Sequence, residues 1–80
     1  MLVFEFWISN NTSRSAALYL EPWGGKYRVP CHGTLRVVIE SPRCPVLEWE
    51  LADDIHTLAV REPAGALATV YDEANPVVAE

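Results

Sequence analysis

Apolar side chains recur at every second position in several segments of this chain, and this period limits what the chain can fold into. The clearest example is the segment 46–51, in which Leu47, Trp49 and Leu51 alternate with Val46 and two glutamates. A period of two places apolar side chains on one face of a β-strand, whereas an amphipathic helix needs a period of about 3.6. The pattern therefore predicts an all-β fold, with Trp49 in its core.

Seven segments of strand length follow one another, separated by clusters of turn-forming residues. The predicted strands cover residues 2–8, 16–20, 26–29, 34–40, 46–51, 55–60 and 66–71, and the tail 72–80 either adds an edge strand at 77–78 or frays. Strands that recur every 8 to 12 residues or so are typical of sandwiches and barrels. We therefore predict one domain over residues 1–80, a small antiparallel β-sandwich or partly open barrel of about seven strands.

Consecutive antiparallel strands place their connections alternately at the two ends of a sandwich. One end then collects the connections 9–15, 30–33 and 53–54, and the other collects 22–25, 41–45 and 61–65. We expect Cys31, His32 and Asp53 at the first end, and Trp23 and Arg61 at the second. Loops at the ends of a sandwich often carry binding residues.

The 80 residues carry a net charge of −5, which is unevenly divided: +1 over residues 1–40 and −6 over residues 41–80. The basic stripe of a nucleic-acid-binding protein is absent, so no nucleic acid is expected. No apolar run approaches the roughly 20 residues that cross a bilayer, so no membrane contact is expected. The first residues lack the basic region and cleavage site of a secretory signal, which predicts a cytoplasmic protein.

The two cysteines, Cys31 and Cys44, flank the predicted strand 34–40. Seven extended residues span about 23 Å, whereas a disulfide needs Cα atoms roughly 4.4–6.8 Å apart. We therefore predict free thiols, which suit a reducing compartment.

A metal site is one functional alternative. Thiolate and imidazole are ligands that copper and zinc prefer, and Cys31, His32 and His56 are expected at one end of the fold. Adjacent residues of an extended chain point to opposite faces, so Cys31 and His32 share a metal only in a bent turn. The other interpretation is a turn with a thiol and a surface imidazole.

Catalysis is not predicted, and we expect no catalytic residues and no cofactor. Asp53 and Asp54 are neighbours in a short hairpin, so their side chains diverge and they serve as turn residues. The pair Gly24-Gly25 stands alone and does not form a phosphate-binding loop.

A protein-binding surface is the favoured interpretation. Trp23 lies in a tight turn, where it either closes one end of the core or anchors a partner, with Tyr27, Arg43 and Arg61 around it. Tryptophan, tyrosine and arginine are enriched at interface hot spots. The segment 2–8 is a second candidate, because an unpaired edge strand with Glu5 as its only charge can pair with another protein or with a second copy. We expect a non-catalytic protein-binding or interaction module.

The stretch from Glu21 to Pro30, with its Glu-Pro-Trp-Gly core and Tyr27, resembles a group of small uncharacterised bacterial proteins that share an EPWG-x-x-Y segment. The resemblance covers about half of the chain, from Trp7 to Glu40. It implies a small β-sandwich, loosely like a cupredoxin without an established copper site, and no accepted activity. The turn Pro30-Cys31-His32-Gly33 is longer here than in that group.

Overall fold

The computed structural model describes residues 1–80 as eight β-strands without a helix. The strands are β1 (Leu2–Ser9), β2 (Ala16–Glu21), β3 (Gly25–Val29), β4 (Thr34–Ser41), β5 (Val46–Ala52), β6 (Ile55–Glu62), β7 (Leu67–Asp72) and β8 (Asn75–Pro76). The all-β prediction is confirmed, and each of the seven predicted strands forms within two residues of its expected bounds. The tail adds its short strand at Asn75–Pro76 rather than at 77–78.

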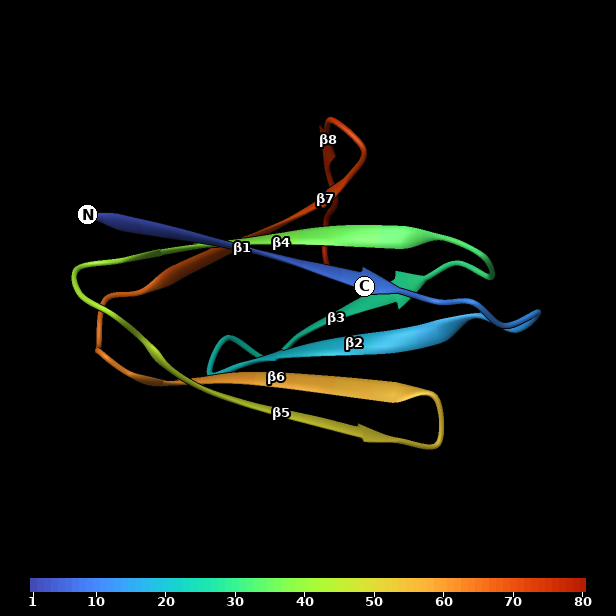
Figure 1. Ribbon diagram of the computed structural model, residues 1–80, viewed down its shortest axis with the longest axis horizontal. Helices are drawn as coiled ribbons and strands as arrows, with labels where there is room; N and C mark the ends of the chain where they lie inside the picture. Colours follow the sequence, from blue (N-terminus) through green and yellow to red (C-terminus); the bar gives the residue numbers. More distant parts are fainter.

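The strands form two four-stranded sheets that face each other as a sandwich (Figure 1). One sheet has the order β1-β4-β7-β8, and the other has the order β3-β2-β6-β5. Five of the six strand pairs are antiparallel, and β2 pairs in parallel with β6. Each connection between consecutive strands reverses the direction of the chain. Four reversals separate β2 from β6, so these two strands run in the same direction and pair in parallel.

The core lies between the two sheets and is made of aliphatic side chains. In β4, Leu35, Val37 and Ile39 are fully buried, while the residues between them face out. The ten core residues are Leu18, Leu20, Val29, Leu35, Val37, Ile39, Leu58, Val60, Ala66 and Val70. The two-residue period thus becomes one buried and one outer face on each sheet.

The β5–β6 hairpin has the two-residue turn expected from the sequence. Asp53 and Asp54 have φ angles of 49° and 62°. Two consecutive positive φ angles are typical of a type I′ turn, which matches the twist of the strands it joins, and aspartate tolerates this region better than most residues. The turn fixes which residues of β5 face the core.

One edge of the sandwich is closed by the end of the chain. After β8, the Val77 amide donates to the Val70 carbonyl at 2.8 Å, and the Val77 side chain packs against the core. The Glu80 amide then donates to the Lys26 carbonyl of β3 at 2.8 Å. We call β3, β8 and residues 77–80 the closed edge, because the tail bridges the two sheets there.

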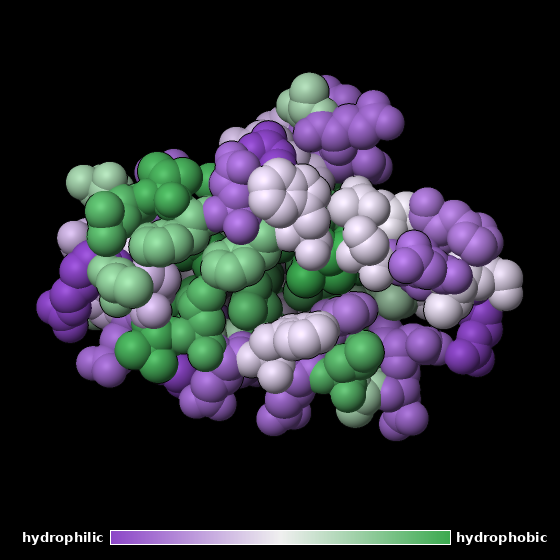
Figure 2. Space-filling model, in the orientation of Figure 1, coloured by the Kyte–Doolittle hydropathy of each residue, from purple (hydrophilic) through white to green (hydrophobic).

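The opposite edge is formed by β1 and β5, and we call it the open edge. Each of these strands has a neighbour on one side only. Figure 2 looks into this edge and shows apolar side chains gathered between the two strands. The open edge therefore exposes part of the sandwich interior.

Trp49 lies at this open edge, so the prediction that it belongs to the core is wrong. Its partner in β6 is the buried Leu58, which shows that Trp49 faces the inner side of its sheet, yet Trp49 is 60% exposed. The alternation gave its face correctly. It did not reveal that β5 is an edge strand, on which an inward-facing side chain can remain exposed.

Candidate functional site

The loops at the first end of the sandwich meet around Asn10, as the alternation of connections predicted. The buried Asn10 side-chain amide donates to the carbonyls of Arg14, Val29 and Pro30 at 2.6, 3.3 and 3.2 Å. Its Oδ1 accepts from the backbone and the hydroxyl of Thr12. These bonds satisfy a buried polar group and tie the β1–β2 loop to the β3–β4 turn.

The residues of the metal alternative occupy separate positions at this end. Cys31 is an exposed free thiol in the β3–β4 turn, and His32 beside it has a φ of 53°. His56 lies on β6, where its Nδ1 accepts a hydrogen bond from the Trp49 indole at 3.3 Å. No three His, Cys, Asp or Glu side chains are grouped to hold a metal ion. Cys44, in the β4–β5 loop, is also free and exposed.

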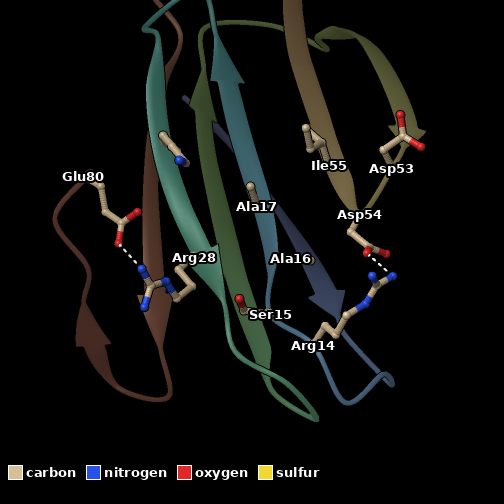
Figure 3. A pocket seen from close by; sticks show the side chains of 10 residues that line it. Arg14, Ser15, Ala16, Ala17, Arg28, Asp53, Asp54, Ile55 and Glu80 are labelled. Carbon is tan, nitrogen blue, oxygen red and sulfur yellow. Dashed lines mark hydrogen bonds and ion pairs between the residues drawn. The ribbon is translucent and has the colours of Figure 1, made fainter.

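A shallow charged hollow of about 500 Å³ lies on the outer side of β2, β3 and β6 (Figure 3). Arg14 pairs with Asp54 at 2.7 Å, and Arg28 pairs with Glu80 at 3.6 Å. Three basic and three acidic side chains line it: Arg14, Lys26, Arg28, Asp53, Asp54 and Glu80. Because these charges cancel and both arginines have partners, the hollow attracts neither anions nor cations strongly.

The second end brings together only part of the predicted Trp23 surface. Trp23 and Arg61 line one hollow, with Pro22 and Pro63, and Trp23 is 40% exposed. Tyr27 instead packs against the core from β3, and its ring lies close to Gly25. Arg43 stands exposed in the β4–β5 loop, where its carbonyl accepts from the buried Ser41 hydroxyl.

Arg61 is held to the outer face of β5 rather than free to meet a partner. Its guanidinium donates to the two Glu48 carboxylate oxygens at 3.0 and 3.4 Å. This hydrogen bonding and the charge of Glu48 raise the pKa of Arg61 above its ordinary value. Arg61 therefore neutralises one of the two outward glutamates of β5.

The open edge holds a set of poorly covered apolar side chains. On β5, Leu51 is 58% exposed and Trp49 is 60% exposed, while Leu47 packs on the core. On β1, Leu2 is 46% exposed and the inward Phe4, Phe6 and Ile8 are only partly buried. Exposed apolar side chains that gather on one surface, rather than standing singly, mark interaction sites on soluble proteins.

His56 fixes the exposed Trp49 ring in one orientation. The two rings stack with centroids 5.9 Å apart and planes 8° from parallel. The Trp49 indole N–H also donates to Nδ1 of His56 at 3.3 Å. These two contacts restrain the orientation of the indole, so a partner that binds its apolar face loses less side-chain conformational entropy.

The sequence does not identify β5 as a site, because clean alternation is typical of a strand that faces the core. The signal available was the pair Glu48 and Glu50, which face outward on either side of Trp49.

Searches of protein-family models, curated proteins and solved structures found no match to this chain. The structure also contains no helix of the length and apolarity needed to cross a membrane.

Proposed function

We propose that this chain is a non-catalytic protein-interaction module that holds an extended segment of a partner along its open edge. The observation that carries the proposal is the exposure of Trp49 and Leu51, two side chains that face the inner side of their sheet and are nevertheless 60% and 58% exposed. Strand addition is a common mode of peptide recognition, in which main-chain hydrogen bonds give affinity and alternate side chains give specificity.

The position of the exposed residues supports strand addition over a contact with flat surface patches. Trp49 and Leu51 are two apart on one strand, so their side chains have the same two-residue spacing as the side chains on one face of an added strand. An edge strand also presents unpaired N–H and C=O groups that accept a further strand. A partner segment that pairs with β5 places every second side chain over the open edge.

The two exposed free thiols, Cys31 and Cys44, support a cytoplasmic location as part of this proposal. The Trp23 hollow is not included, because its predicted companions Tyr27 and Arg43 do not join it.

The proposal is tested by selecting random ten-residue peptides against the chain and measuring their binding to two matched variants. Leu51→Asp places a charge on the open edge. Leu67→Asp makes the same change on the outer face of β7, at a leucine that is 59% exposed against 58% for Leu51. Selected peptides should lose at least tenfold in affinity with Leu51→Asp and keep their affinity with Leu67→Asp. Equal losses, or none, would contradict the proposal.

A further inference from the structure

We infer that the open edge selects a partner strand in which apolar side chains alternate with lysine or arginine, and that this strand pairs with β5. The inference rests on the proposed function, since it names the chemistry of the segment held there. It is carried by two faces of one edge strand: an inner face that is apolar and exposed, and an outer face that is acidic.

The inner face sets the apolar positions of the partner strand. Trp49 and Leu51 stand on β5 opposite Leu58 and His56 of β6, so the sandwich interior continues past β5 at these two positions. Across the opening lie the partly buried Phe4 and Phe6 of β1. Only apolar side chains on a strand added to β5 cover these residues without leaving a polar group unpaired.

The outer face sets the charged positions. Glu48 and Glu50 alternate with Trp49 and therefore face away from the core. Arg61 pairs with Glu48, whereas Glu50 makes no ion pair. Glu21 lines the same hollow as these two glutamates, so three carboxylates there face one guanidinium. A lysine or arginine opposite Glu50 on an added strand lies at cross-strand distance and completes the pairing.

A second copy of the chain carries this chemistry only on β3, where Lys26 and Arg28 alternate with Tyr27. The tail occupies that edge, because the Glu80 amide donates to the Lys26 carbonyl and the Glu80 carboxylate pairs with Arg28. The outward charge on β1 is Glu5, which already pairs with Arg36, and the outward charges on β5 are the two glutamates. Pairing two copies through these strands therefore sets carboxylates against carboxylates, in a chain whose net charge is −5. Like charges opposite one another destabilise a strand pair, which is how sheet edges are protected against self-association.

The test compares three eight-residue peptides, in which valine alternates with lysine, with threonine or with glutamate. Their affinities are measured by calorimetry at low salt, for the wild type, Glu50→Lys and Glu40→Lys. Glu40 is an exposed glutamate without an ion pair on β4, so Glu40→Lys makes the same change in net charge away from β5. Leu51→Asp reports whether any binding uses the open edge.

On the wild type, the lysine peptide should bind about fivefold to tenfold more tightly than the threonine peptide, and the glutamate peptide should bind most weakly. Glu50→Lys should reverse this order, and Glu40→Lys should preserve it. If the lysine and threonine peptides bind equally and Leu51→Asp abolishes both, the interaction function stands and the charge inference is overturned. If no binding depends on Leu51, the proposed function fails as well.

Sedimentation equilibrium of the same proteins tests whether a second copy of the chain occupies the open edge. The wild type should be a monomer, like Leu51→Asp. A wild-type dimer that dissociates with Leu51→Asp but not with Leu67→Asp would overturn the inference, because the open edge would then bind a second copy.

Discussion

The two edges of this sandwich end in different ways. At the closed edge, residues 77–80 cross from one sheet to the other, with Val77 packed on the core and Glu80 bonded to the backbone of β3. At the open edge, β1 and β5 have no bridging segment, and Trp49 remains 60% exposed on the inner side of its sheet. A small β-sandwich thus completes its core on one side with its own chain and leaves the other side available.

The difference shows that the same alternating pattern of apolar side chains is buried on a central strand and exposed on an edge strand. The strand order decides which. Residues on the central strands β4 and β6 stabilise the fold, because both sheets cover them. Trp49 and Leu51 on β5 follow the same pattern but are more than half exposed.

Charge placed on the closed edge should destabilise the fold most. Val77→Asp puts a carboxylate against the apolar core, and we expect a loss of about 2–4 kcal/mol in the free energy of unfolding. Leu51→Asp, on the open edge, should cost less than about 1 kcal/mol, since that side chain is already more than half exposed. Urea denaturation of the two variants measures the contrast, and equal losses would show that the edges do not differ.

Removal of the Trp23 ring should have an intermediate effect. Trp23 shares its hollow with Pro22 and Pro63 and is 40% exposed, so Trp23→Ala should cost about 1–2 kcal/mol, less than the removal of a buried aromatic ring. Peptide affinity at the open edge should not change. Thermal unfolding and calorimetry on the same sample check both statements, and a loss of peptide binding would move the site to the second end.

Removal of the Trp49 ring should cost little stability. Trp49→Ala should lower the free energy of unfolding by less than about 1 kcal/mol, whereas a core tryptophan typically costs about 3–5 kcal/mol. Trp7→Ala is the matched control, because Trp7 is also 60% exposed but lies on the outer face of β1, opposite Arg36. Both variants should unfold at similar urea concentrations. If Trp49→Ala alone lost as much free energy of unfolding as a core tryptophan does, the open edge would be closed in solution.

The smallest effect is expected at the exposed ion pair of the closed edge. Arg28 and Glu80 are 3.6 Å apart with most of Arg28 in water, so Glu80→Gln should change stability by less than about 0.5 kcal/mol. A larger loss, measured by urea denaturation, would indicate that charge rather than Val77 packing holds this edge.

Much of the fold could be predicted from the sequence because its determinants are local. Alternation located the strands, and Asp53-Asp54 located a hairpin whose turn needs residues that tolerate positive φ. The grouping of loops at each end followed from the antiparallel connections. These features depend on neighbouring residues alone.

The strand order could not be predicted, and the candidate site depends on it. The parallel pairing of β2 with β6 joins residues that are 38 apart in the sequence, such as Ala17 and Ile55, which no short pattern specifies. The same packing makes β5 an edge and exposes Trp49, while Tyr27 on β3 is covered beside the chain terminus. The two-residue period of the sequence indicates which face of the sheet a residue lies on. Whether that face is covered depends on tertiary packing.

The most direct test is an NMR titration of the ¹⁵N-labelled chain with the peptide in which valine alternates with lysine. The account predicts chemical-shift changes in the Trp49 indole and in the β5 amides, with smaller changes in β1. It predicts none in β3 or residues 77–80. Shifts centred on the closed edge or on Trp23, or a Trp49 indole signal that does not move at saturation, would contradict it.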